Sequence, residues 1–188
     1  MQPILREVPE RLESTRLTLR SPRPGDGPMI FEAVRDSIDE LRRYPAYLPW
    51  VVAEPSVEAA ETFCREGCAN FIARRDFPYL VLLRDSGAMV GASGLHHVDW
   101  RVPKFEIGFW GRTAYRRAGL LTEAVRALLD LAFEKLGARR VEVLTDDAND
   151  RACALCERLG LVLEGTLRYE RVAPDGSLCS TRVYALTR

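Results

Sequence analysis

The stretch Lys104–Leu136 constrains the fold most, because its apolar pattern changes period part-way along. At its start Phe105, Ile107 and Phe109 alternate with other residues, which is the period of two that a β-strand shows. From Leu120 onward, apolar residues recur every three or four positions between charged ones, which is typical of an amphipathic helix. The sequence therefore predicts a strand that runs through a short turn into a long helix.

The turn between that strand and that helix carries Arg116, Arg117, Ala118 and Gly119. A helix N-terminus offers unpaired backbone N–H groups and about half a positive charge, glycine lets an anion approach the backbone, and arginine forks suit phosphate. The turn therefore predicts a diphosphate site. The alternative, which the same residues allow, is that the two arginines are solvated and that Gly119 only loosens the start of the helix. The motifs G-x-G-x-x-G and G-x-x-x-x-G-K-[ST] are absent, which argues against dinucleotide-binding proteins and P-loop NTPases.

Length, charge and cysteine usage limit the class of protein. A chain of 188 residues suits one domain spanning 1–188, and its formal net charge of zero predicts no general attraction to nucleic acid or to an anionic membrane. The five cysteines are an odd number and the first residues lack an apolar signal core, so we expect a reduced, cytoplasmic compartment. Cys153 and Cys156 lie within a helical pattern without metal-type partners, which favours structural thiols and no metal site.

Strand and helix patterns are mixed along the rest of the chain. Strands are predicted over 16–20, 79–84, 89–98, 139–145, 161–170 and 179–186, and helices over 27–44 (interrupted near Ser37), 57–70 and 149–159. The strand at 139–145 follows a helical crossover, so it should run parallel to the strand at 104–110. Tyr44–Trp50 mixes aromatic residues with proline, so we expect irregular backbone that either walls a binding groove or packs over the core edge. The pattern predicts one mixed α/β domain.

Several pieces of the chain occur in an order and spacing that resemble the GNAT superfamily of acyl-CoA-dependent N-acetyltransferases: LRSPRPGD, SVEAAETF, FEIGFWG, RRAGLLTEAVRALLDLAF, RRVEVLTDDAND and ERLGLVLEGTLRYE. Within it the chain is similar to the branch that contains the ribosomal-protein N-terminal acetyltransferases. The resemblance covers nearly the whole chain. It implies an α+β fold with a largely antiparallel sheet of about six to seven strands, helices on both faces, and a central parallel pair that splays to hold acyl-CoA.

The resemblance also implies how the co-substrate, acetyl-CoA, is bound. The superfamily's [QR]-x-x-G-x-[GA] turn falls on Arg116, Gly119 and Leu121, and Leu121 departs from the pattern because a small residue is expected there. The backbone amides of Ala118 to Thr122 remain available to the diphosphate, with Arg117 beside them. A leucine in place of a small residue at position 121 bears on how closely the backbone can surround the diphosphate.

For the rest of the co-substrate, the resemblance implies that the pantetheine arm lies along Phe109–Trp110, where the parallel strands separate. It also implies that Asn149 holds the arm by a side-chain hydrogen bond, a role compatible with capping a helix. Many relatives place a tyrosine seven residues after this asparagine as the acid that protonates the departing thiolate, and here Cys156 stands there. Cys156 is either that acid or a buried inert thiol.

The implied reaction is direct attack of a neutral amine on the thioester, so we look for a general base. Glu106 lies on the central strand before the proposed thioester site and is the first candidate, although an ion-paired strand carboxylate would look the same. His96 and His97 close the preceding strand, and adjacent residues of a strand point to opposite faces, so one of them faces the acceptor. His96 is therefore a second catalytic candidate.

The sequence does not identify the acceptor. The branch that the chain resembles implies the N-terminal α-amine of a protein, with a small amine such as an antibiotic, polyamine or amino acid as the alternative. A module that binds acyl-CoA without transferring it is a third possibility, which the missing tyrosine and Leu121 favour. The resemblance also makes a homodimer a reasonable expectation, and nothing in the composition indicates nucleic acid or membrane as a partner.

Overall fold

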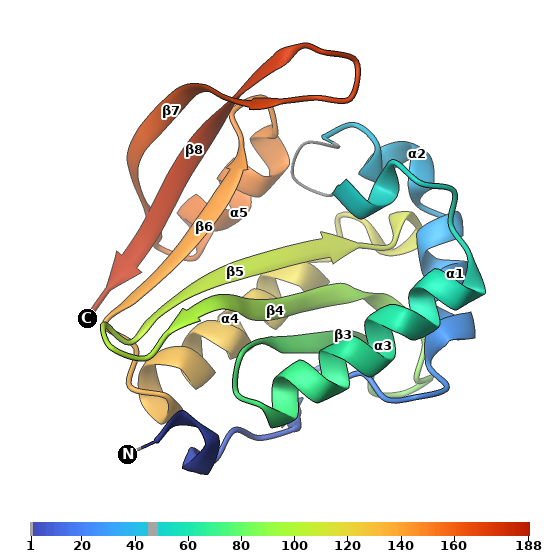
Figure 1. Ribbon diagram of the computed structural model, residues 1–188, viewed down its shortest axis with the longest axis vertical. Coiled ribbons are helices and arrows are strands. Elements are labelled where there is room, and N and C mark those ends of the chain that lie inside the picture. The colour runs from blue at the N-terminus through green and yellow to red at the C-terminus, as the bar shows by residue number, and fades with distance from the viewer. Residues whose placement is uncertain (1, 45–48) are drawn as a thin grey trace.

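The computed structural model describes residues 2–44 and 49–188 and contains one eight-stranded sheet (Figure 1). The strands follow the order β1-β2-β3-β4-β5-β6-β8-β7 across the sheet, and every neighbouring pair is antiparallel except β5 and β6. They are β1 (Arg11–Glu13), β2 (Leu17–Arg20), β3 (Phe77–Leu83), β4 (Met89–Asp99), β5 (Lys104–Gly111), β6 (Arg140–Asp146), β7 (Val162–Val172) and β8 (Leu178–Thr187). The predicted fold class is confirmed, and the short β1 is the strand that the sequence pattern did not predict.

Helices cover both faces of this sheet, as predicted (Figure 1). They are α1 (Gly27–Arg35), α2 (Ile38–Leu41), α3 (Val57–Ile72), α4 (Leu120–Asp130) and α5 (Asp150–Arg158), with short 3-10 helices at Pro3–Leu5, Pro49–Val51 and Thr113–Tyr115. Alternate residues of β3 supply the two cores: Tyr79 and Val81 pack with α4, whereas Leu80 and Leu82 pack with α1 and α3. This alternation is why the central strands are buried on both sides.

The predicted helix from Gly27 toward Tyr44 is interrupted at Ser37, which separates α1 from α2. At this break the Ser37 hydroxyl oxygen accepts a hydrogen bond of 3.0 Å from the backbone N–H of Thr113. The contact holds the start of α2 against the segment that follows β5. Of the predicted irregular stretch Tyr44–Trp50, residues 45–48 lie outside the described part of the chain.

The strand-to-helix unit predicted from Lys104–Leu136 is present as β5, a 3-10 turn and α4. The helix ends at Gly137, whose φ is +70°, as predicted, but its last turn, Leu131–Lys135, is π-helical and not α-helical. Leu131, Ala132 and Phe133 are all buried in this turn, and the wider turn keeps these consecutive residues against the core. No helix in the described ranges combines the length and the apolar character that a membrane span needs.

The parallel strands β5 and β6 separate soon after they meet. They pair only where Lys104, Phe105 and Glu106 face Arg140–Glu142, whereas β6 stays paired with β8 from Arg140 to Asp146. Beyond Glu106, β5 remains paired with β4 alone, so its edge toward β6 is open (Figure 1). The predicted splayed pair is therefore confirmed.

Candidate functional site

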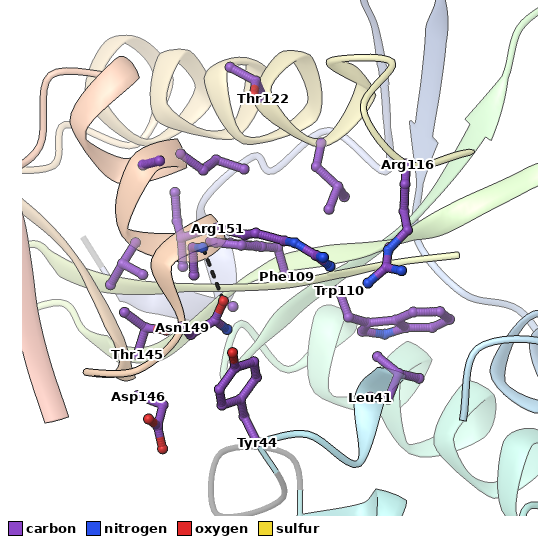
Figure 2. A pocket seen from close by; sticks show the side chains of 18 of the residues that line it. Leu41, Tyr44, Phe109, Trp110, Arg116, Thr122, Thr145, Asp146, Asn149 and Arg151 are labelled. Atoms are coloured by element: carbon purple, nitrogen blue, oxygen red, sulfur yellow. Dashed lines mark hydrogen bonds between the residues drawn. The ribbon is translucent and has the colours of Figure 1, made fainter. Parts of the chain in front are cut away.

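A cavity of about 1060 Å³ lies where β5 and β6 separate. The second half of β5, the turn before α4, the start of α5 and residues of α2 all contribute to its lining. Every predicted cofactor-binding residue except Ala118 lines it: Phe109, Trp110, Arg116, Arg117, Gly119, Leu121, Thr122 and Asn149. Residues predicted from separate motifs are thus brought together around one space (Figure 2).

The turn before α4 presents unpaired backbone donors to this cavity. Arg117 and Gly119 have φ values of +61° and +73°, and this left-handed backbone bends the chain into the helix. The backbone N–H groups of Ala118 to Thr122 have no hydrogen-bond acceptor within the described part of the chain. At the N-terminus of an eleven-residue helix these donors favour an anion, and glycine keeps the backbone uncovered.

Arg16 braces this turn from behind, a role that the sequence pattern did not indicate. Its Nη1 donates to the carbonyl oxygen of Ala118 at 2.9 Å, and its Nε donates to Glu123 Oε2 at 2.7 Å. Burial would raise the pKa of Glu123, but hydrogen bonds from the Arg16 backbone, Ser14 and the Arg16 side chain outweigh it and hold the pKa below its usual value. The carboxylate is therefore ionised at neutral pH and fixes Arg16 against the turn.

Glu40 of α2 connects two arginines across the cavity. Its Oε1 contacts Nη2 of Arg116 and lies 2.6 Å from Nη1 of Arg151, which comes from the start of α5. Figure 2 shows the Arg116 and Arg151 side chains pointing toward each other from the α4 and α5 sides. The predicted basic residue of the turn is therefore ion-paired in this structure, and Glu40 and Arg151 are members of the site that sequence reasoning missed.

Leu121, which stands where the family pattern has a small residue, packs against Gly111 at the end of β5. A Cβ atom built on Gly111 would lie 2.7 Å from Leu121 Cδ1, so the space that Leu121 fills exists because Gly111 lacks a side chain. Trp110 packs against Trp50 with ring centroids 5.9 Å apart and ring planes tilted by 57°, and Phe109 packs on the main core. The open half of β5 thus has an apolar wall of large side chains.

Asn149 caps α5, as predicted, and also lines the cavity, whereas its hydrogen bond to a pantetheine arm stays a prediction. Its Oδ1 accepts from the backbone N–H of Ala152 at 3.2 Å, drawn as a dashed line in Figure 2. This bond uses the side-chain oxygen and leaves the amide nitrogen to donate elsewhere. The Tyr44 hydroxyl donates to the carbonyl oxygen of Ala148 at 3.1 Å, which joins α2 to the loop before α5.

The candidate bases differ in position. Glu106 lines the cavity, is 23% exposed, and its Oε2 lies 2.9 Å from Nδ1 of His97, which lines the cavity too. His96 does not line it, since its ring fills the space above Gly94 and its Nδ1 lies 2.7 Å from Asp76 Oδ1. The Glu106–His97 pair is therefore accessible from the cavity, whereas His96 is not.

The prediction that the two histidines point to opposite faces is wrong. His97 has a φ of +48° and lies where the β4–β5 register is interrupted, so the regular alternation ends there. The His96 ring lies close to Gly108 and the His97 ring contacts Glu106, and these two residues of β5 share one face of the sheet. Both histidines therefore lie over the face that carries Glu106.

Cys156 does not occupy a position from which it could protonate a thiolate in the cavity. It is fully buried, it does not line the cavity, and burial raises the pKa of its thiol to about 12. These observations favour the inert-thiol alternative. Across the described ranges, no group of three or more His, Cys, Asp or Glu side chains is arranged to hold a metal ion.

Comparison with known proteins decides the family. The model of the acetyltransferase (GNAT) domain family matches residues 16–162, which is well over half of the chain. The chain belongs to the GNAT acetyltransferase family. Among its GNAT relatives, YdaF of Bacillus subtilis, provisionally named a ribosomal N-acetyltransferase, is 28% identical over 157 residues and 81% of either chain. The predicted family and enzyme class are thereby confirmed.

Two solved GNAT structures share this fold. RimL, a ribosomal L7/L12 alpha-N-protein acetyltransferase solved with coenzyme A, has a TM-score of 0.86 at 18% identity, over 95% of this chain and 98% of its own. The microcin C7 self-immunity acetyltransferase MccE, solved with acetyl-CoA and AMP, also has a TM-score of 0.86, at 15% identity over 96% of this chain and 98% of its own. At such low identity the two likenesses establish the fold and not the acceptor.

Proposed function

We propose that this GNAT enzyme transfers the acetyl group of acetyl-CoA to the N-terminal α-amine of a protein. The observation that carries the proposal is the row of unpaired amides from Ala118 to Thr122, of which Gly119 to Thr122 line the cavity where β5 and β6 separate. A helix N-terminus with uncovered backbone suits a diphosphate. The names of YdaF and RimL, both referring to ribosomal N-acetylation, support a protein acceptor.

In this proposal the amides of the turn bind the diphosphate, and Arg116 and Arg117 add charge-assisted hydrogen bonds. Phe109 and Trp110 on the open edge of β5 hold the pantetheine arm, together with the side-chain amide of Asn149. Acetyl-CoA supplies the activated acetyl thioester. A backbone N–H of the open edge beyond Glu106 stabilises the developing oxyanion in this proposal, which is supported by the absence of β6 pairing beyond Glu106.

Glu106 serves as the general base in the proposed reaction. An α-amine has a pKa near 7.7 to 8.0, so roughly a tenth of it is already neutral at pH 7 and needs only modest help to lose a proton. General-base assistance is typically worth about 10²–10⁴-fold in rate, so a variant without the base should be slow and not dead. Glu106 meets the positional requirement because its side chain lines the cavity beside the open edge of β5.

The test mixes the protein with acetyl-CoA and a panel of acceptors while free thiol is measured. With short peptides that begin with serine, alanine or methionine, coenzyme A thiol should be released from acetyl-CoA. With the same peptides carrying a blocked α-amine, it should not. Mass spectrometry should place the acetyl group on the first residue. Release with antibiotics, polyamines or amino acids alone would assign a small-amine acceptor, and acetyl-CoA binding without any release would indicate a binding module.

The cytoplasmic location and the homodimer remain predictions from the sequence. Apolar residues stay exposed along the edge strand β7, among them Val162, Leu167 and Tyr169. A second copy of the chain would be one way to cover them. Sedimentation of the purified protein measures this directly.

A further inference from the structure

The backbone at His97 is unusual for a residue near the end of a strand. Its φ of +48° lies in the left-handed region, which is unfavourable for a non-glycine residue. The bend coincides with the break in β4–β5 pairing between His96 and Asp99. Without the bend, alternation would direct His97 to the α4 face, away from Glu106. The unfavourable backbone therefore has one visible result, the contact between His97 Nδ1 and Glu106 Oε2.

The pair formed by Glu106 and His97 runs from the cavity toward solvent. The Glu106 side chain is 23% exposed, whereas the His97 side chain is 76% exposed. Nδ1 of His97 contacts Glu106, and its Nε2 has no protein partner within the described ranges. An imidazole can accept a proton on one ring nitrogen and release one from the other. The arrangement thus joins a carboxylate in the cavity to bulk water through one ring.

We propose that His97 carries the proton of the acceptor amine from Glu106 to solvent; the proposal rests on the function of Glu106 proposed above. When Glu106 acts as base, an N–H bond of the acceptor breaks and an O–H bond forms on the carboxyl group. In the resting state Nδ1–H of His97 donates to the Glu106 carboxylate. Once Glu106 is protonated, exchange with water at the exposed ring moves the ring proton to Nε2, and Nδ1 accepts the carboxyl proton. The resulting imidazolium releases its Nε2 proton to water, which restores the Nδ1–H tautomer and the Glu106 carboxylate. His97 is thus a positioning residue that acts through Glu106.

The first test is chemical rescue of His97→Ala, using acetyl-CoA and a serine-first peptide as substrates. We expect kcat to fall about tenfold, less than the 10²–10⁴-fold that general-base help supplies as a whole, and KM for acetyl-CoA to stay unchanged. Added imidazole should restore much of kcat, because the ring it replaces is exposed and within reach of solvent. Glu106→Gln should be slow and should not respond to imidazole.

Two further variants separate proton transfer from mere support. His97→Asn keeps a donor near the Nδ1 position but cannot carry a proton, so it should be as slow as His97→Ala. His96→Ala is the matched control, because His96 also holds a carboxylate through Nδ1 but lies outside the cavity lining. Whatever its rate, it should not respond to imidazole. Thermal unfolding of each variant checks that it is folded.

The outcomes separate this inference from the proposed function. A wild-type rate in His97→Ala or His97→Asn overturns the proton path, and so does a His97→Ala variant that does not respond to imidazole. If Glu106→Gln is slow in the same experiments, Glu106 remains the general base. A wild-type rate in Glu106→Gln removes the base, and the proton path fails with it. Absence of thiol release from the unmodified enzyme with every acceptor refutes the transfer reaction itself.

Discussion

Removing the charge of Glu40 should strengthen the binding of acetyl-CoA. Glu40 Oε1 contacts Arg116 and Arg151, the two arginines that face each other across the cavity beside the unpaired amides. A diphosphate at the turn would need the same guanidinium groups, so the carboxylate and the diphosphate compete for them. Glu40→Gln keeps the size of the side chain and abolishes the competing charge.

The structure sets the size of the effect. The Glu40 side chain is 25% exposed, and the two arginine side chains are 34% and 62% exposed, so solvent screens both ion pairs. Pairs of this kind are each worth about 0.2–1 kcal/mol, or about 0.4–2 kcal/mol for the two together. Since 1.4 kcal/mol is a factor of ten in affinity, Kd for acetyl-CoA should fall by roughly 2- to 30-fold. The gain should shrink as salt is added.

Tryptophan fluorescence offers a direct assay, because Trp110 lines the cavity and packs against Trp50. Titration with acetyl-CoA, checked by calorimetry, gives Kd for the wild-type protein and for Glu40→Gln. Asp39→Asn is the matched control, since Asp39 is exposed on the same helix and has no ion pair among the described residues. An unchanged or weaker affinity in Glu40→Gln, with Asp39→Asn equal to wild type, would refute the competition and would mean that Glu40 positions the arginines for the ligand.

Two further predictions concern the turn itself. Arg116→Ala/Arg117→Ala should raise Kd for acetyl-CoA while the melting temperature stays close to wild type, because both side chains lie at the cavity rim; unchanged affinity would argue against diphosphate binding there. The pKa of Glu123 is lowered in the folded state, so its contribution to stability is present above its unfolded pKa and is lost as pH falls through its folded pKa. Denaturant unfolding of Glu123→Gln should therefore show a loss of about 1–2 kcal/mol near pH 7 that shrinks below about pH 4, and a loss independent of pH would contradict the brace by Arg16.

Much of the fold could be predicted because periodicity is a local property of the chain. The alternation in β5 and the helical repeat in α4 each extend over enough residues to distinguish the two periods. By contrast, β1 spans only Arg11–Glu13, which is too short to show a period. The π-helical turn at Leu131–Lys135 also escaped prediction, because the packing of a run of buried residues, and not their spacing, decides it.

In the candidate site, too, local features could be predicted from the sequence and long-range contacts could not. The turn at Arg116–Gly119 is formed by consecutive residues, so the sequence alone could indicate it as a candidate diphosphate site, and that role stays a prediction. The residues that control this turn come from distant parts of the chain: Arg16 and Glu123 are 107 residues apart, and Glu40 and Arg151 are 111 apart. Such contacts leave no periodic signal in one sequence. The left-handed backbone at His97 was missed because histidine carries no mark of it, unlike glycine.

Leu121 shows why a departure from a motif has to be judged in three dimensions. A small residue at this position would leave room beside the turn, and the larger leucine suggests a blocked site. The structure has Gly111 opposite, so Leu121 fills the space that a side chain at Gly111 would need, and the amides of Ala118 to Thr122 remain unpaired. The large side chain of Leu121 is therefore compensated by the missing side chain of Gly111. A leucine at the small position is thus compatible with binding of the diphosphate and does not favour a module that has lost its activity.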